Sequence, residues 1–344
     1  MPANIAYDVL RHQYQAKYVG KPPWHGLGEV RPDDQPMTIA DATKGVSDYT
    51  VDKAPLYALI DGVYREVTGW EATYRTDTGD VFAPVSKDYE VIQNATPMEM
   101  LMAIVGTKEA GFVAHAALGK GERLFAVLDL KRLTDIHIPG DPSRYDPFLV
   151  AQWWHNGGGA LTFGPSLVRV DCQNMANAQL AYGEKKGMLA RVIHVGDTKT
   201  AVEEAQRVLG FAEKRITDYV GLLRSLNEIA VPAPEDKWMD GFLEKLVPIP
   251  PEMDKAYGRE RAREAIRHLY RDSDTMVDVP HTAYRVLQAV EEYSDHWRPL
   301  HAKPELVPAR RFTTAVDGPA AELKAKAQTL LVQEFEVKVP VAVR

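Results

Sequence analysis

Residues 111–130, GFVAHAALGKGERLFAVLDL, consist of two apolar runs separated by a short turn that contains glycine. Residues 111–118 and 124–130 have the length and the apolar side chains of buried strands. Gly119-Lys120-Gly121 between them can reverse the chain, because glycine adopts the backbone conformations that tight turns require. The stretch therefore predicts two antiparallel strands joined by a three-residue turn.

Similar signals predict further strand pairs on both sides of this stretch. Asp61-Gly62 lies between residues 56–60 and 63–67, and this dipeptide supplies the two positive φ angles of a type I′ hairpin turn. Two more pairs are predicted, residues 71–75 with 81–85 and residues 149–155 with 160–170. The last pair is separated by Asn156-Gly157-Gly158-Gly159, which we interpret as a hairpin turn because the Lys and Ser/Thr of a phosphate loop do not follow it.

Helical patterns dominate the second half of the chain. Apolar residues repeat with a period of 3.6 from Thr198 to about Ile229 and predict one long helix. A shorter helix is predicted from Asn174 to Tyr182. Beyond residue 230, proline-containing segments and further helical patterns alternate, with helices expected at residues 237–246, 254–270, 282–293 and 320–332.

These elements predict an α+β fold, in which an antiparallel β-sheet is packed by a long helix and a helical C-terminal region follows. We expect an N-terminal arm over residues 1–50, an α+β core domain over residues 51–230 and the helical region over residues 231–344.

The composition is that of an ordinary globular protein. The 344 residues include 41 Lys and Arg against 48 Asp and Glu, for a net charge of −7. This balance excludes a uniformly basic nucleic-acid coat protein but allows local basic surfaces. The single cysteine, Cys172, excludes a disulfide bond within the chain. Without a long apolar stretch or a signal-peptide pattern, we expect a cytosolic protein with no membrane partner.

Motifs of familiar enzymes are missing from the sequence. It contains no P-loop, no dinucleotide-binding glycine pattern, no metalloprotease motif and no nucleophile elbow. Four histidines on predicted strands lack a metal-ligand spacing: His115, His137, His155 and His194. Cys172 could be an activated thiol at a helix start, although a small buried residue is the simpler interpretation. We therefore predict no catalytic residue, metal site or cofactor, and enzymatic activity stays an open question with a negative answer favoured.

The middle of this acidic chain is basic. Residues 101–200 contain 11 Lys and Arg against 9 Asp and Glu, whereas residues 1–100 contain 9 against 15. A sheet face with aromatic rings inside a rim of cations suits single-stranded nucleic acid, because bases stack on rings and phosphates attract cations. The candidate nucleic-acid-binding residues are Lys120, Arg123, Lys131, Arg132, Trp153, Trp154, Arg169, Lys185, Lys186 and Arg191. The simpler alternative is a solvated rim around a core that contains both tryptophans.

A second basic stretch lies in the helix predicted at residues 254–270. Arg259, Arg263 and Arg267 are four residues apart and therefore share one face. This face could follow a phosphate backbone, or it could contact the acidic N-terminal segment of a neighbouring subunit.

Several segments together resemble one known family. They are WHGLG at residues 24–28, YEVIQN at 89–94, RVDCQN at 169–174, RVIH at 191–194 and TAYRVLQAVEEYSDH at 282–296. In this order they are similar to the phage/plasmid-like proteins of domain-of-unknown-function family 932, over about residues 20–332. Asp171 departs from the family pattern, where an apolar or small residue is more frequent, and this weakens a phosphate-binding role for Arg169.

The resemblance implies a bacteriophage or plasmid protein that works in the cytoplasm of a bacterial host. A distant similarity to single-strand annealing proteins, the Rad-fifty-two superfamily and the RecT/Redβ group, implies a small sheet with a packing helix, assembly into rings and DNA in a positively charged groove. The leading hypothesis is a non-enzymatic phage recombination protein that binds and anneals single-stranded DNA as a homo-oligomer, either a ring or a filament.

Two alternatives from other functional classes stay open. A metal-dependent nuclease or another nucleic-acid-modifying enzyme would use His194, Asp197 and His155, or the pair Asp295-His296. A host-interaction protein would use the acidic N-terminal segment as a decoy surface, and it would not bind DNA at physiological salt.

Overall fold

The computed structural model describes residues 5–9, 11–20, 28–32, 35, 37–106, 111–130, 133, 136–169, 174–177, 190–192, 198–249, 253–300, 314 and 318–338. The chain divides into two compact units, each assembled from separate segments. The sheet unit comprises residues 1–132, 149–164 and 189–211, and the helical unit comprises residues 133–148, 165–188 and 212–344.

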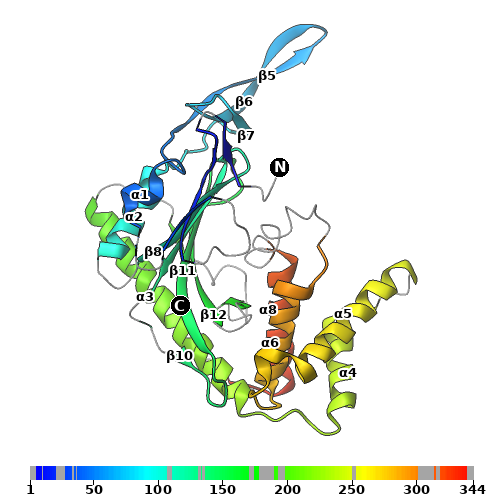
Figure 1. Ribbon diagram of the computed structural model, residues 1–344. Helices are drawn as coiled ribbons and strands as arrows, with labels where there is room; N and C mark the ends of the chain where they lie inside the picture. Colours follow the sequence, from blue (N-terminus) through cyan, green and yellow to red (C-terminus); the bar gives the residue numbers. More distant parts are fainter. Residues whose placement is uncertain are drawn as a thin grey trace. The chain divides into compact units, whose positions relative to one another are not determined.

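Three long elements contribute residues to both units (Figure 1). They are strands β11 (Arg144–Trp154) and β12 (Leu161–Arg169) and helix α3 (Thr198–Asn227). For this reason the division of the chain does not fall at the expected boundary near residue 230, and residue 50 lies inside the first segment of the sheet unit.

The main sheet follows the strand order β13-β12-β11-β9-β8-β3-β4, with β14 paired to β12 and β10 paired to β11. Its other strands are β3 (Ala16–Val19), β4 (Glu29–Arg31), β8 (Gly111–Leu118), β9 (Arg123–Asp129), β10 (Ile136–His137), β13 (Asn174–Asn177) and β14 (Ala190–Val192). β8 pairs antiparallel with β3 and β9, whereas β3 and β4 are parallel. The expected N-terminal arm thus supplies two strands of this sheet, and a two-stranded sheet of β1 (Tyr7–Asp8) and β2 (Gln13–Tyr14) precedes them.

The strand pair predicted from residues 111–130 is confirmed. β8 and β9 are antiparallel, and their last pair before the turn is Leu118 opposite Arg123. Gly119 and Gly121 have φ angles of 69° and 106°, which other residues rarely adopt. A Cβ atom at Gly121 would lie 2.7 Å from the hydroxyl of Tyr49, so this position also needs glycine for space.

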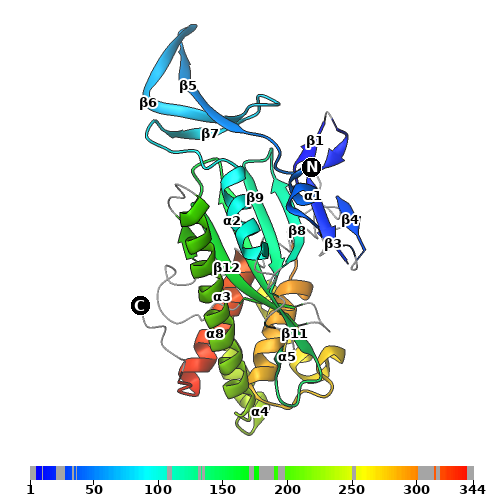
Figure 2. The same cartoon turned by 90° about the vertical axis from the view of Figure 1, so that its left-hand side faces the viewer.

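Helices cover one face of the main sheet within the sheet unit. α1 (Ile39–Thr43), α2 (Ala95–Gly106) and the first half of α3 lie on this face (Figure 2). Leu101 and Ile104 of α2 and Val208 of α3 are buried there. The α+β class, with an antiparallel sheet, a long helix and helices at the C-terminal end, is confirmed.

A second sheet of the same unit ends in a projecting hairpin. It has the order β5-β6-β7, formed by β5 (Val51–Ile60), β6 (Val63–Arg75) and β7 (Val81–Ser86). β7 pairs only with residues 70–74 of β6, so residues 56–68 form a two-stranded tip. Asp61 and Gly62 have φ angles of 51° and 77°, and these two positive values confirm the turn predicted from the Asp-Gly dipeptide.

The helical unit is built around a helix that is buried on all sides. Every residue of α6 (Ala283–Glu292) is buried. The π-helix η3 (Tyr293–Trp297) continues from it, and the other helices of the unit are α4 (Glu235–Leu246), α5 (Met253–Asp272), the short 3₁₀ helix η2 (Asp274–Met276) and α8 (Pro319–Glu334). None of the helices in the described residues is both long and apolar enough to cross a membrane.

The helix predicted at Asn174–Tyr182 is wrong for residues 174–177, which form β13. This strand pairs antiparallel with the end of β12, where Arg169 lies opposite Asn174. The ladder hydrogen bonds with β12 outweigh the weak helix preference of asparagine in so short a segment. The remainder of the predicted helix lies outside the described residues.

Candidate nucleic-acid interface

Arg123 and Trp154 meet on a half-exposed face of β9 and β11. Side chains alternate along a strand, so Gln152 and Trp154 share one face of β11 while Trp153 points to the other. The Nη2 atom of Arg123 donates to Oε1 of Gln152 at 2.7 Å, and its guanidinium carbon lies 5.3 Å from the centroid of the Trp154 ring. Gln152 belongs to this site although the pattern of cations and aromatics does not indicate it.

The glycine-rich turn after β11 lies against the Trp154 ring. A Cβ atom at Gly159 would be 2.9 Å from this ring, so only glycine lets the loop approach it so closely. The side chain of Asn156 accepts a hydrogen bond from the backbone of Gly158 at 2.9 Å and holds the loop. Tyr89 donates to the carbonyl of Trp154 at 3.2 Å. The predicted turn is confirmed, and it also positions the aromatic ring.

Lys120 lies on the adjacent turn between β8 and β9 and is exposed. Its Nζ atom donates to the carbonyl of Val81 at 3.2 Å, and its backbone amide donates to the carboxylate of Glu122 at 2.6 Å. Among the ten candidate residues, Lys120, Arg123 and Trp154 are therefore the ones whose described side chains reach the surface.

Trp153 cannot stack on a base, which corrects one part of the prediction. Its side chain is 0% exposed, because it points to the face of the sheet that the helices cover. Its ring stacks on His115 with the centroids 5.6 Å apart, and Nε1 donates to Oδ1 of Asn94 at 2.9 Å. Trp153 is a core residue, as the simpler alternative holds, and Trp154 is the tryptophan that can contact a strand.

The histidines near Trp153 are core residues as well. Burial lowers the pKa of both His115 and His155 to about 4, so both are neutral at physiological pH. His155 donates through Nε2 to the same Asn94 oxygen at 2.8 Å. His115 contacts the carbonyl of Phe125 and the hydroxyl of Ser47, both at 2.8 Å.

The structure does not describe the side chains of the other candidate cations. Lys131, Arg132, Lys185 and Lys186 lie outside the described residues. Only the backbone positions of Arg169 and Arg191 are described, Arg169 opposite Asn174 and Arg191 opposite Thr162. These two arginines are thus at opposite ends of β12.

The residues considered for a metal-dependent nuclease do not come together in the described part of the chain. His155 is buried, and Asp295 accepts hydrogen bonds from Lys324 at 2.9 and 3.2 Å. His194 and Asp197 lie outside the described residues. Within the described ranges, no three His, Cys, Asp or Glu side chains are grouped as metal ligands.

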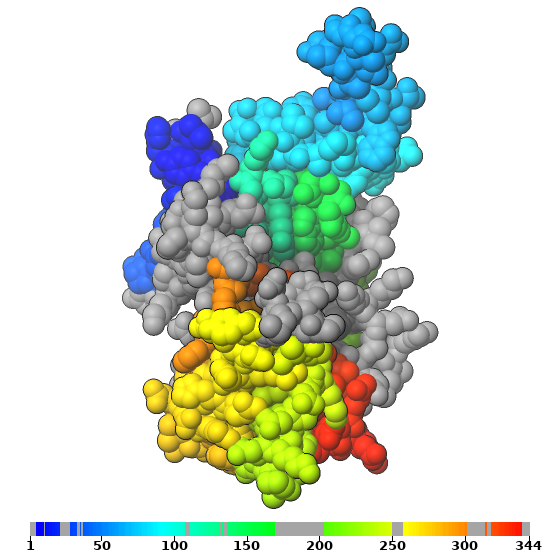
Figure 3. Space-filling view, turned by 90° about the vertical axis from the view of Figure 1, so that its right-hand side faces the viewer, coloured from blue at the N-terminus to red at the C-terminus, as the bar shows by residue number. Residues whose placement is uncertain are grey.

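The basic face predicted on α5 is largely occupied by contacts within the helical unit. Arg267 and Arg271 form ion pairs with Asp240 and Asp236 of α4, and the surfaces of the two helices adjoin in Figure 3. Arg263 donates to the carbonyl of Val247 at 2.9 Å. These three arginines therefore hold α4 and are not available to follow a phosphate backbone.

Comparison with known proteins identifies one family. A family model described as a domain of unknown function, DUF932, matches residues 81–327. Neither a curated protein nor a solved structure matches the chain. The matched residues make up well over half of the sequence and include both the Arg123–Trp154 face and α6. The chain therefore belongs to the DUF932 family, as the resemblance of its motifs indicates.

Proposed function

We propose that this protein binds single-stranded DNA and anneals complementary strands, as a non-enzymatic homo-oligomer of phage recombination in the cytoplasm of a bacterial host. The observation that carries the proposal is the contact of Arg123 with the Trp154 ring on the half-exposed face of the main sheet. An aromatic ring stacks with a base of any sequence, and a guanidinium beside it attracts the adjacent phosphate. Annealing requires these two properties and needs neither a nucleophile nor a metal.

The charge distribution supports the same function. Lys120 is exposed on the turn next to Arg123, and Lys131, Arg132, Lys185 and Lys186 belong to the same basic stretch of the sequence, residues 101–200. Affinity for a strand depends on the phosphates that are contacted locally, so a net charge of −7 is compatible with binding.

The DNA-binding prediction is tested by fluorescence anisotropy of a labelled oligonucleotide, single- and double-stranded, across a salt series. We expect a preference for the single strand and a steep loss of affinity with salt. Trp154→Ala should weaken binding about tenfold or more without changing the salt dependence, since a stacked base contributes about 1–3 kcal/mol. Arg123→Gln should weaken binding and reduce the slope of log affinity against log salt by about 0.7, the value for one phosphate of a single strand.

Matched variants control for general effects on the fold. Trp297→Ala removes an exposed tryptophan of the helical unit, and Arg144→Gln removes an exposed arginine at the other end of β11. Both should bind like the wild type, whereas Lys185→Glu with Lys186→Glu should abolish binding. Flat anisotropy traces at low salt from folded protein, or a Trp154→Ala variant with wild-type affinity, would contradict the proposal.

The tip of the β5–β6 hairpin supports the proposed homo-oligomer. Tyr57, Leu59 and Tyr64 are 53%, 62% and 73% exposed, although they are large and apolar. Leu59 and Tyr64 lie opposite each other, and no third strand covers them among the described residues. Clusters of exposed apolar side chains mark interaction surfaces, and a two-stranded hairpin is only marginally stable alone. We infer that a second copy of the chain covers this tip.

This inference predicts that Leu59→Glu with Tyr64→Glu reduces the mass of the particle in solution to that of one chain. Burying two unpaired charges at a subunit contact costs more free energy than the contact contributes to association. The measurement is size-exclusion chromatography with light scattering, and Arg65→Ser on the opposite side of the same hairpin is the control. A wild-type protein that is monomeric, or a double variant with unchanged mass, would refute the role of the tip.

A further inference from the structure

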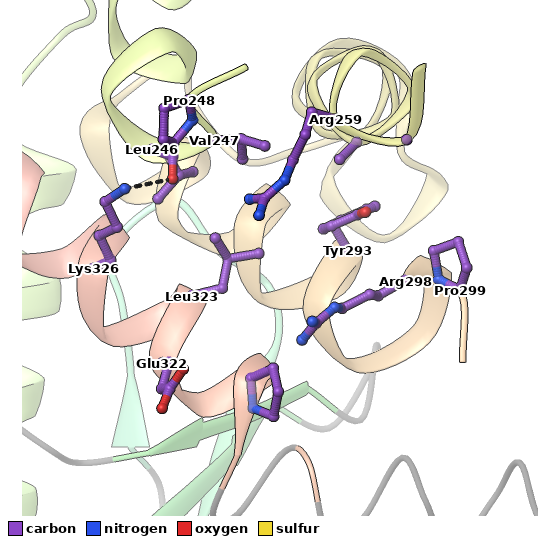
Figure 4. A pocket seen from close by; sticks show the side chains of 13 residues that line it. Leu246, Val247, Pro248, Arg259, Tyr293, Arg298, Pro299, Glu322, Leu323 and Lys326 are labelled. Atoms are coloured by element: carbon purple, nitrogen blue, oxygen red, sulfur yellow. Dashed lines mark hydrogen bonds between the residues drawn. The ribbon is translucent and has the colours of Figure 1, made fainter. Parts of the chain in front are cut away.

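A cavity of about 660 Å³ lies in the helical unit, open to solvent and lined by the end of α4, by α5, by η3 and by α8 (Figure 4). Three of the side chains that line it are cations, Arg259, Arg298 and Lys326. The one carboxylate among its described lining residues is Glu322. The cavity is therefore positive, although the chain as a whole carries a net charge of −7.

Arg298 presents a hydrogen-bond donor that lacks an acceptor. Its Nη1 atom is enclosed by the protein and has no partner in the part of the chain that the structure describes. The backbone amide of Arg298 donates to the carbonyl of Tyr293 at 2.7 Å and so fixes the origin of the side chain at the end of η3. An enclosed N–H group without an acceptor is costly, and an oxygen anion in the cavity would remove this cost.

Arg259 enters the same cavity from α5, and Figure 4 shows its guanidinium and that of Arg298 directed into the space beside Leu323. Within the described residues Arg259 forms neither a hydrogen bond nor an ion pair. Lys326 donates to the carbonyl of Leu246 at 2.8 Å. Burial and then the positive charge of Arg259 lower the pKa of Lys326, so Arg259 and Lys326 repel each other and an anion between them would stabilise both.

The rest of the lining is apolar. Leu246 at the end of α4, Ala262 of α5 and Leu323 of α8 supply aliphatic surface, and three prolines border it. Tyr293 is mostly buried beside them, and burial raises the pKa of its hydroxyl against the opposing effect of Arg298. A ligand complementary to this lining has an anionic group and an apolar or aromatic body.

We propose that the cavity binds a phosphate monoester of about nucleotide size, with its phosphate on Arg259 and Arg298 and its organic part along Leu323 and Ala262. A phosphate offers several strong acceptor oxygens to two planar guanidinium groups, a geometry that arginine matches well. The volume lies within the range of small-molecule sites and exceeds the needs of an inorganic ion. The site shares no residue with the Arg123–Trp154 face, so it does not depend on the proposed DNA binding.

The test is isothermal titration calorimetry of the full chain with AMP, inorganic phosphate and adenosine. AMP should bind, inorganic phosphate should bind more weakly, and adenosine should give no measurable heat. Arg298→Gln and Arg259→Gln should each lower the affinity for AMP about tenfold or more, as expected for the loss of a charged hydrogen bond. Glu322→Gln should raise the affinity, because it removes a negative charge from the lining.

Arg261→Gln is the matched control, since Arg261 is an exposed residue of the same helix that lies 5.6 Å from the ring of Tyr257 and outside the cavity. It should leave AMP affinity unchanged, as should Trp154→Ala, which separates this site from the proposed DNA interface. Thermal melting of each variant verifies its fold. No heat with AMP, or wild-type affinity in both Arg298→Gln and Arg259→Gln, would overturn the proposal. Binding of a 5′-phosphorylated oligonucleotide but not of AMP would also overturn it.

Discussion

Replacing Arg285 with methionine is expected to lower the free energy of unfolding of the helical unit by about 4 kcal/mol, because several buried acceptors lose their donor. Arg285 on α6 is 3% exposed. It donates to the carbonyls of Tyr270 at 2.6 Å and Arg271 at 3.1 Å, and also to those of Met276 and Val279. The first two are carbonyls of the last turn of α5, which a helix cannot satisfy within itself. The guanidinium of Arg285 thus satisfies carbonyl groups at the end of α5 and holds the segment between α5 and α6 in place.

Urea denaturation followed by tryptophan fluorescence measures the effect. Arg285→Lys should lose most of the same free energy, since an ammonium cannot reach carbonyls in four directions as the planar guanidinium does. Arg261→Met, an exposed arginine of α5, should change the stability by about 0.5 kcal/mol or less. An Arg285→Met variant within about 1 kcal/mol of the wild type would show that water satisfies these carbonyls instead.

Lys324→Met should have an effect of similar size, about 3–5 kcal/mol at pH 8, because it leaves buried carboxylates without their cation. Lys324 and Asp295 are almost completely buried and form an ion pair with distances of 2.9 and 3.2 Å. Glu291 lies one turn earlier on α6, where Tyr219 donates to it at 3.0 Å. Burial raises the pKa of Glu291 to about 7, the charge of Lys324 opposes this shift, and Asp295 adds to it.

The loss should be smaller at pH 5 than at pH 8. The pKa of Glu291 is raised in the folded protein, so between pH 4.5 and 7 the folded state keeps a proton that the unfolded state releases. The contribution of this group to stability is therefore present at low pH and is lost as the pH rises through this window. Without Lys324 the carboxylate of Glu291 becomes still harder to ionise, and its protonation at pH 5 removes the cost of burying its charge.

Denaturation at both pH values tests this dependence, with Lys245→Met as the control. Lys245 pairs with Glu334 on the surface and should contribute at most about 1 kcal/mol. Adding Asp295→Asn to Lys324→Met should restore part of the loss at pH 8. Equal losses at pH 5 and pH 8 would be inconsistent with a charge effect and would point to packing alone.

The tight turns of this fold are predictable from the sequence because one or two residues determine each of them. Asp61-Gly62 and Gly119-Lys120-Gly121 give the expected hairpins, and the positive φ angles at Asp61, Gly62, Gly119 and Gly121 supply the reason. The long helix is predictable for a similar reason, since its apolar period extends over many turns. In both cases the information is local.

Pairing between distant segments is not predictable in this way. Nothing in Ala16–Val19 shows that it joins the sheet beside β8, and nothing in Asn174–Asn177 shows that β12 provides a partner. The alternation of side chains places Trp153 and Trp154 on opposite faces of β11, but it does not show which face the helices cover. The sequence therefore predicts that one of these two tryptophans faces the surface, but it does not show which one.

The basic stretch of α5 can be interpreted from the sequence only together with the acidic residues of α4. Arg267 and Arg271 are four residues apart, and so are Asp236 and Asp240 of α4. Matching spacings of opposite charge indicate two packed helices better than they indicate a nucleic-acid surface. Arg298 and Arg259 give no such signal, because they reach the cavity from elements that are far apart in the sequence.

The place of β3 in the main sheet has a consequence for the order of events during synthesis. Its residue Ala16 pairs with Ala116, one hundred positions later in the chain. A ribosome that adds about 5–20 residues per second takes about 5–20 s to reach that partner. The β8–β9 hairpin, whose strands are joined by a short turn, can close within microseconds of leaving the ribosome. β3 therefore stays unpaired with the main sheet until β8, which is synthesised long after it, has formed.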